Sequence, residues 1–135
     1  MIVRKLEDII HTDLDVVGEN WNSRRLLLQK DGMGFSMTVT VIKKGADNYH
    51  WYKNHFEACY CIKGEGEIEI ADENGKKTGV IYKISPGTMY ALNEHDRHYI
   101  RATTADLHLV CVFNPPLTGT EIHDEEGTYP VLTEE

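Results

Sequence analysis

Regular alternation of apolar and polar side chains is the feature that most limits how this chain folds. It is clearest in "FSMTVTVI", from Phe35 to Ile42. A period of two is typical of a β-strand whose two faces lie in different surroundings. One predicted face carries Phe35, Met37, Val39 and Val41, and the other carries Ser36, Thr38 and Thr40.

Further short runs have the composition of strands and are separated by turn signals. They are "EACYCI", "EIEIA", "VIYKI", "HYIRA" and "LHLVCVF", and "NPP" ends the last of them. The loop "DENGKKTG" contains Asn74-Gly75, a pair typical of β-hairpins. Only "KLEDIIHT" near the start has the spacing of a short helix. The pattern therefore predicts an all-β sandwich or barrel with one or two short helices.

Length and charge limit the classes of partner. A chain of 135 residues is expected to form a single domain over residues 1–135 with a real core. Its 14 Lys plus Arg against 22 Asp plus Glu give a net charge of −8, which argues against nucleic acid or an anionic membrane as partner. There is no apolar run of about 20 residues and no secretion signal in "MIVRKLEDIIHTD". Three cysteines without a CxxC pair favour the reducing cytoplasm.

Two stretches resemble the sequence motifs of the cupins, which are double-stranded β-helix or jelly-roll barrels. "GADNYHWYKNHFEACYCIKG" has the glycines and the glutamate, Glu57, of the first motif. His50 stands at the first histidine position of that motif and Tyr52 at the second. "PGTMY" resembles the second motif, with Tyr90 at its histidine position. The resemblance implies a cupin-type barrel in which phenols replace two of the usual imidazole ligands.

These departures and several other stretches resemble one family. "GMGFS", "NHFEA", "YALNEHDRH", "VFNPPLTG" and "EIHDE…YP" are similar to the ectoine synthases, and the resemblance runs from Met1 to Pro130. It implies a cytoplasmic, metal-dependent hydro-lyase. The implied reaction closes the ring of N-γ-acetyl-L-2,4-diaminobutyrate, with loss of water, to give the compatible solute L-ectoine. The resemblance also implies a homodimer, and iron(II) as the metal with zinc(II) as the alternative.

The family's metal ligands fall at Glu57, Tyr90 and His98 in this chain. A carboxylate, a phenolate and an imidazole suit a ferrous ion, although zinc can also occupy such a site. Taken singly, the three residues have ordinary interpretations: a solvated surface acid, a half-buried core tyrosine and a hydrogen-bonded structural histidine. Their joint match to the motif positions favours the metal site.

The family resemblance also assigns substrate contacts. They are Trp21, Arg25, Thr40, Cys111 and Phe113, and Arg25 is expected to pair with the substrate carboxylate. Without the resemblance, Trp21 would be a core anchor and Arg25 a surface charge. Cys111 and Phe113 would likewise be ordinary core residues.

Tyr52, Glu121 and His123 are the predicted catalytic residues. Tyr52 replaces a cupin imidazole and is therefore expected to point inward. Glu121 and His123 lie one residue apart, so an extended backbone presents both on one face, where they can relay protons. An ion pair within a loop is the alternative interpretation. Residues 118–135 are polar and contain glycine, which predicts a flexible lid or tail.

Neighbouring residues have simpler interpretations. Residues 95–97 are expected to hold their loop by hydrogen bonds and ion pairing. Cys59 and Cys61 share the face of the predicted metal-binding glutamate and are interpreted as packing. His55 fits equally a partner of that site or a surface residue.

Two other classes of function stay open at this point. A different metal cupin, such as a dioxygenase, would consume oxygen during turnover, but two cupin histidines are missing. A non-catalytic cupin would bind a small solute without converting it. Formation of the cyclic product by the purified protein with iron(II) would separate these possibilities.

Overall fold

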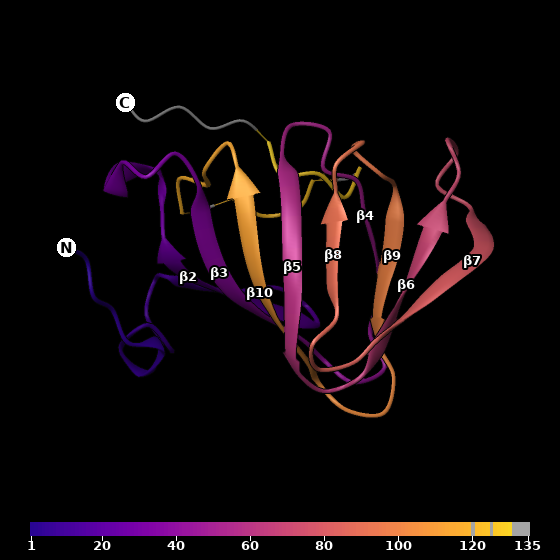
Figure 1. Ribbon diagram of the computed structural model, residues 1–135, viewed down its shortest axis with the longest axis horizontal. Coiled ribbons are helices and arrows are strands. Elements are labelled where there is room, and N and C mark those ends of the chain that lie inside the picture. The colour runs from indigo at the N-terminus through magenta and orange to yellow at the C-terminus, as the bar shows by residue number, and fades with distance from the viewer. Residues whose placement is uncertain (120, 125, 131–135) are drawn as a thin grey trace.

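Two antiparallel β-sheets form a barrel in the computed structural model, which describes residues 1–119, 121–124 and 126–130 (Figure 1). The sheets have the spatial orders β1-β2-β3-β10-β5-β8 and β4-β9-β6-β7. The strands are β1 Asp15–Val17, β2 Trp21–Leu27, β3 Ser36–Ile42, β4 Asp47–His50, β5 Phe56–Lys63, β6 Gly66–Ala71, β7 Lys77–Ile84, β8 Met89–Leu92, β9 His98–Ala102 and β10 Leu107–Asn114. The all-β prediction is confirmed.

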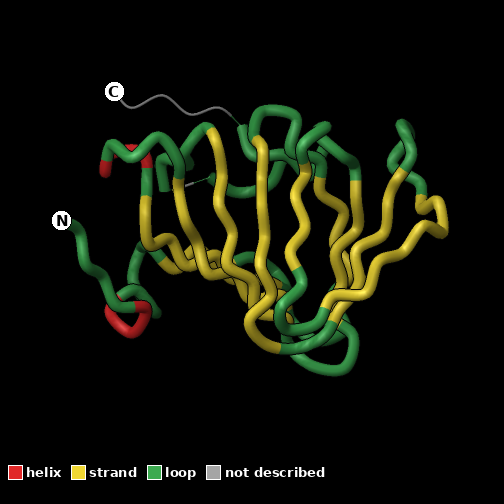
Figure 2. Tube along the Cα trace, viewed as in Figure 1, coloured by secondary structure: helices red, strands yellow, loops and turns green. Residues whose placement is uncertain are grey.

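Helical structure among the described residues is limited to two short 3-10 turns (Figure 2). They are η1 (Leu6–Asp8) and η2 (Gln29–Asp31). The prediction of a helix over "KLEDIIHT" is therefore wrong beyond one turn. No residue of η1 is buried, so this segment lacks the packed apolar face that stabilises short helices. In the part of the chain described here, no helix has both the length and the apolar character needed to cross a bilayer.

The alternating stretch forms β3, but its polar face is the one that points into the barrel. Thr40 pairs in register with Leu109, and Thr38 with Cys111, on the inward face of β10. Thr38 is fully buried, and its hydroxyl lies 3.3 Å from that of Thr40. A polar interior face indicates that this side of the barrel does more than fill a hydrophobic core.

β10 lies between β3 and β5 and supplies the middle of the interior wall. Its inward residues are all buried, and they are Leu107, Leu109, Cys111 and Phe113. Across β5, Phe113 pairs with Glu57 and Cys111 with Cys59. The strand ends at Asn114, as expected from "NPP", and the Asn114–Pro115 peptide bond is cis. This register brings a carboxyl group and two thiols to one part of the barrel wall.

The predicted hairpin at Asn74-Gly75 joins β6 to β7. Gly75 has a φ of 77°, a left-handed conformation that favours glycine. Its N–H donates to the carbonyl oxygen of Asp72 over 3.0 Å, and the N–H of Asp72 donates to the carbonyl oxygen of Lys76 over 2.8 Å. The turn therefore closes as the sequence predicts.

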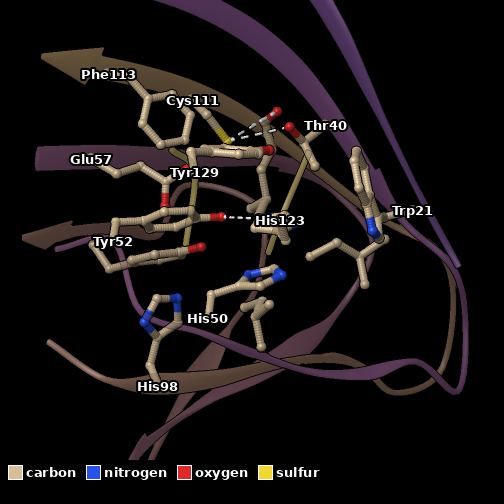
Figure 3. A pocket seen from close by; sticks show the side chains of 14 residues that line it. Trp21, Thr40, His50, Tyr52, Glu57, His98, Cys111, Phe113, His123 and Tyr129 are labelled. Atoms are coloured by element: carbon tan, nitrogen blue, oxygen red, sulfur yellow. Dashed lines mark hydrogen bonds between the residues drawn. The ribbon is translucent and has the colours of Figure 1, made fainter. Parts of the chain in front are cut away.

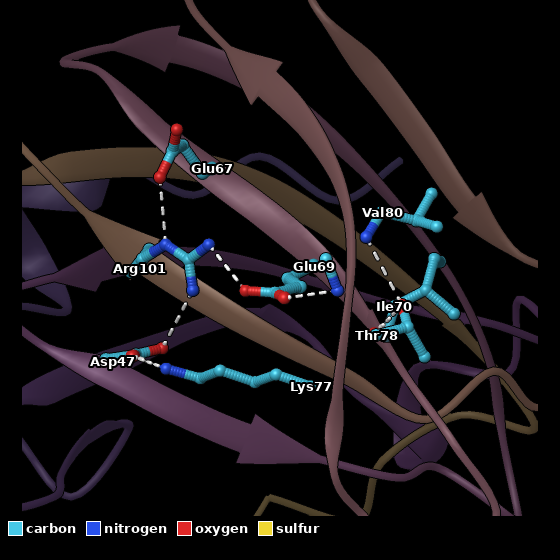
Figure 4. A network of polar contacts seen from close by, with 9 residues as sticks. Asp47, Glu67, Glu69, Ile70, Lys77, Thr78, Val80 and Arg101 are labelled. Carbon is cyan, nitrogen blue, oxygen red and sulfur yellow. Dashed lines mark hydrogen bonds and ion pairs between the residues drawn. The ribbon is translucent and has the colours of Figure 1, made fainter.

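An ion-pair network ties the strands of the smaller sheet together (Figure 4). Arg101 on β9 donates hydrogen bonds to two glutamates of β6, with distances of 2.9 Å to Glu67 and 2.8 Å to Glu69. It also lies 3.5 Å from Asp47 on β4, which pairs with Lys77 on β7. The hydrogen bonds that the guanidinium donates to Glu67 and Glu69 raise its pKa. The network links all four strands and holds β9, which begins at His98, in place.

Candidate active site

A small pocket lies inside the barrel, between the two sheets (Figure 3). Its cavity volume is about 30 Å³, roughly a fifth of the ~150 Å³ cavity that can hold a benzene molecule in a protein core. Its lining residues are Trp21, Thr40, Ile42, His50, Tyr52, Glu57, Tyr90, His98, Ile100, Leu109, Cys111, Phe113, His123 and Tyr129. The space fits an ion, whereas a small organic substrate requires side chains to move.

Most of the residues singled out from the sequence meet in this pocket. All three predicted metal ligands line it, and so do Tyr52 and His123 of the predicted catalytic set. Four of the five predicted substrate contacts do so as well. Arg25 and Glu121 are not among the lining residues.

Glu57 occupies the inward face of β5 and is buried. Burial raises the pKa of its carboxyl group from 4.5 to about 7, although hydrogen bonds from the thiols of Cys59 and Cys111 act in the opposite direction. Its charged form is therefore costly in the absence of a nearby cation. A carboxylate in this position suits a metal ion.

His98 is the first residue of β9 and is almost completely buried. Its Nδ1 lies 3.0 Å from the carbonyl oxygen of Asp96. A carbonyl can only accept, so Nδ1 carries the proton and Nε2 keeps a free lone pair. Burial lowers the pKa of His98 to about 4, so the ring is neutral at pH 7. An imidazole with Nδ1 bonded to a backbone carbonyl is the usual form of a histidine metal ligand.

Tyr90 lies on β8, opposite Cys59 of β5. Burial raises the pKa of its phenol, and the neighbouring Cys59 and Glu57 raise it further. The phenol therefore stays protonated unless a cation is close. Glu57, Tyr90 and His98 together give oxygen and nitrogen donors from three strands, and this donor set fits a ferrous or zinc ion.

Tyr52 and His123 form a hydrogen-bonded pair in the pocket, with 2.7 Å between the phenol oxygen and Nε2. Burial raises the pKa of Tyr52 and lowers that of His123 to about 3, so both are neutral at pH 7. A phenol is a better donor than acceptor, which favours the tautomer in which Tyr52 donates to Nε2 and His123 carries its proton on Nδ1. Among the described residues, Nδ1 has no hydrogen-bond partner.

Arg25 and Glu121 form a buried pair behind the pocket. One guanidinium nitrogen of Arg25 donates a hydrogen bond of 2.5 Å to the backbone oxygen of Glu121. A second guanidinium nitrogen lies 3.5 Å from the Glu121 carboxylate. Burial tends to raise the pKa of Glu121, but hydrogen bonds from the N–H groups of Thr118 and Gly119 outweigh it and lower that pKa. Arg25 is fully buried, so its alternative interpretation as a surface charge is wrong.

Five lining residues were absent from the candidate set, and two of them, His50 and Tyr129, carry polar groups. His50 stacks on His123 with 3.9 Å between ring centroids, and Tyr129 stacks on His123 at 4.3 Å. His50 occupies the first histidine position of the cupin motif, and Tyr129 belongs to the "YP" of the resembling segment. The sequence motifs therefore contained the information needed to select both residues as candidates.

The loop and packing residues around the site are also resolved. His95 bonds through Nδ1 to the backbone oxygen of Tyr52 over 2.7 Å, which supports the expected role in holding the loop. Arg97 stacks on Trp51, with 3.7 Å between its guanidinium carbon and the ring centroid. His55 is buried, so its interpretation as a surface residue is wrong.

The two-sheet barrel with inward carboxyl, phenol and imidazole groups defines the chain as a cupin. The same fold occurs in KdgF from Halomonas sp., with a TM-score of 0.60 and 19% identity over 74% of this chain and 84% of that chain. The ectoine synthase crystal structure from P. lautus is much more similar, with a TM-score of 0.84 and 57% identity over 100% of this chain and 93% of that one.

Sequence comparisons narrow the assignment further. The family model "Ectoine synthase" matches residues 1–133. L-ectoine synthase from Desulfatibacillum aliphaticivorans is 59% identical over 98% of each chain. L-ectoine synthase from Oceanobacillus iheyensis is 55% identical over 99% of this chain and 100% of the relative. The chain belongs to the ectoine synthase family.

Proposed function

We propose that the pocket closes the ring of N-γ-acetyl-L-2,4-diaminobutyrate to give L-ectoine, with loss of water. The family assignment gives the enzyme class, a hydro-lyase, and the product, an osmoprotective solute. One observation carries the proposal for the site: Glu57, Tyr90 and His98 line the same enclosed pocket as the Tyr52–His123 pair.

The reaction needs three kinds of assistance. The substrate amide is a poor electrophile, its α-amine is mostly protonated at neutral pH, and the departing hydroxyl must gain a proton. Glu57, Tyr90 and His98 are the proposed ligands of iron(II), with zinc(II) as the alternative. When bound, the ion supplies a Lewis acid for the amide carbonyl oxygen.

Tyr52 and His123 act on the substrate oxygen in this proposal. The Tyr52 hydroxyl fixes the His123 tautomer by donating to Nε2, which leaves the Nδ1–H available to the substrate. This N–H can donate to an oxygen on which negative charge develops, and a fixed donor in a dry site stabilises such charge strongly. The surrounding aromatic rings exclude water and can face the substrate ammonium group.

The C-terminal segment serves as the proposed lid. Its described part supplies His123 and Tyr129 to a pocket that is too small for the substrate, so the segment has to move for entry. Movement would separate Glu121 from Arg25 and free the guanidinium to bind the substrate carboxylate during entry, before closure returns His123 to the pocket and Glu121 to Arg25. Glu121 thus acts in the closed state as a partner of Arg25. Residues 120, 125 and 131–135 of the predicted lid lie outside the described residues.

We also propose a cytoplasmic homodimer. The three cysteines are free thiols, which suits a reducing compartment. Phe56, Tyr60 and Met89 expose large apolar side chains on neighbouring strands β5 and β8, and an exposed apolar patch is typical of an interface. Sedimentation of the purified protein would test the dimer.

The activity test uses purified protein, iron(II) and the acetylated substrate under argon, with the cyclic product followed by NMR. Wild type should form L-ectoine, and His98→Ala should not. His108→Ala is the matched control because His108 lies on the other face of β10, away from the pocket, and it should retain activity. Absence of product with iron-loaded wild type, or turnover that requires oxygen, would contradict the proposal.

A further inference from the structure

At the wall of the pocket, two thiols that are not in the donor set proposed for iron meet one member of that set, the carboxyl group of Glu57. Cys59 on β5 and Cys111 on β10 pair directly in register, and both side chains are buried. Their sulfur atoms lie 3.4 Å apart. One carboxylate oxygen of Glu57 and the two sulfurs all lie within 4.8 Å of one another.

We propose that Glu57, Cys59 and Cys111 form a second metal-binding site, selective for thiophilic divalent ions such as zinc and cadmium. Thiolates bind such ions much more readily than harder ions, for which oxygen donors are preferred. The ion takes one carboxylate oxygen and two thiolates, and the two thiol protons leave to solvent. A water molecule can complete the tetrahedral set.

The geometry of the three donors fits this ion class. With zinc–sulfur bonds of about 2.3 Å, two sulfurs on a tetrahedral ion lie about 3.8 Å apart. The observed 3.4 Å therefore requires an opening of only a few tenths of an ångström. Glu57 and Cys59 lie two residues apart on the same strand face, and β10 presents Cys111 directly opposite Cys59. Adjacent paired strands thus hold the donors with little freedom.

The surroundings distinguish this site from ordinary cysteine packing. Figure 3 shows Cys111 close to the polar Thr40, and the distance from its sulfur to the threonine hydroxyl is 3.6 Å. Cys61, the third thiol, points to the backbone oxygen of Lys63 at 3.6 Å and is not part of the cluster. On β5, Cys59 therefore belongs to the proposed site, whereas Cys61, the next cysteine on the same strand face, does not.

Glu57 belongs to both donor sets, so the two sites cannot be filled independently. An ion on Glu57, Cys59 and Cys111 withdraws the carboxylate from Tyr90 and His98. Thiophilic ions should therefore compete with iron(II) for the protein. This competition rests on the proposed function, whereas the thiolate site itself does not.

The test titrates metal-free protein, kept reduced with a phosphine, with cobalt(II) and cadmium(II). With cobalt(II), thiolate ligation gives a sulfur-to-metal charge-transfer band in the near ultraviolet, which carboxylate and imidazole ligands do not reproduce, and the Tyr90→Phe variant excludes a phenolate contribution. Wild type should show this band. Cys59→Val should lose it and bind cadmium at least about tenfold more weakly, since loss of even an outer-shell partner has an effect of that size.

Two controls separate this site from its neighbours. Cys61→Val makes the same change two residues along the strand and should keep the band. His98→Ala removes a ligand proposed for iron alone and should also keep it, so failure of the iron assignment leaves this result unchanged. Loss of the band in either control, or its survival in Cys59→Val, would overturn the site.

X-ray absorption at the cadmium edge gives a measurement that needs no variant. Two sulfur neighbours in the wild-type cadmium form would support the site. Oxygen and nitrogen neighbours alone would overturn it, even if Cys59→Val failed to fold.

Discussion

Replacing Glu57 by Gln should stabilise the metal-free protein, and increasingly so as the pH rises. Burial raises the pKa of the Glu57 carboxyl group from 4.5 to about 7. A carboxyl group with a raised folded-state pKa contributes stability that is fully present below pH 4.5 and is lost as the pH rises through 7. At 1.36 kcal/mol for each pH unit, the complete loss is about 3 kcal/mol. Gln has nearly the same shape and carries no charge to bury.

The experiment compares urea unfolding of chelator-treated wild type and Glu57→Gln between pH 5.5 and pH 8.5. Over this window the free energy of unfolding of the variant should rise by about 2 kcal/mol relative to wild type. This is less than the full loss of about 3 kcal/mol because part of the wild-type loss has already occurred between pH 4.5 and pH 5.5, below the measured range. Buried histidines titrate alike in both proteins, so their contributions cancel in the difference between the two free energies of unfolding. Glu121→Gln is the matched control, because the pKa of Glu121 is lowered and its difference from wild type should stay constant here. A constant difference for Glu57→Gln would refute the reasoning.

Three further outcomes follow from the site. Glu57→Ala and His98→Ala should each lose most bound iron and most activity, as measured by metal analysis and turnover, while their melting curves stay near that of wild type; retained iron would count against the ligand set. Truncation after Leu117 removes His123 and the rest of the lid, so turnover should be abolished while iron titration still shows binding; equal turnover would exclude a lid. Arg25→Lys should raise KM more than it lowers kcat, because lysine lacks the bidentate fork for a carboxylate, and an unchanged KM would remove Arg25 from substrate binding.

Strands with strong patterns were predictable from the sequence. β10 is long and mostly apolar, and β3 carries the clearest period of two. The sequence did not indicate which face of β3 points inward. Alternation normally marks the apolar face as interior, but here the interior is partly a pocket, and hydroxyl groups line it.

Shorter and more polar strands were missed for local reasons. β2 reads "WNSRRLL" and contains Arg25, a residue type that is seldom fully buried. β8 lies at the edge of its sheet and has only four residues, which are too few to show a clear alternation of apolar and polar side chains.

Sequence patterns also could not predict contacts between residues that are far apart in the chain. The contact that explains the burial of Arg25 comes from Glu121, 96 residues further along the chain. Spacing along the chain says nothing about such a pair. The pocket residues were found largely because motif positions, rather than local patterns, identified them.

The most direct test of the metal centre is the colour of the oxidised iron protein. Ferric phenolate complexes absorb visible light, so iron-loaded wild type should become coloured on oxidation if Tyr90 is a ligand. Tyr52→Phe should keep both iron affinity and colour, because Tyr52 bonds to His123 instead. Tyr90→Phe keeps the ring but removes the donor, and we expect weaker iron binding and no visible band. Wild-type affinity and full colour in Tyr90→Phe would contradict the assignment of Glu57, Tyr90 and His98 as the metal centre.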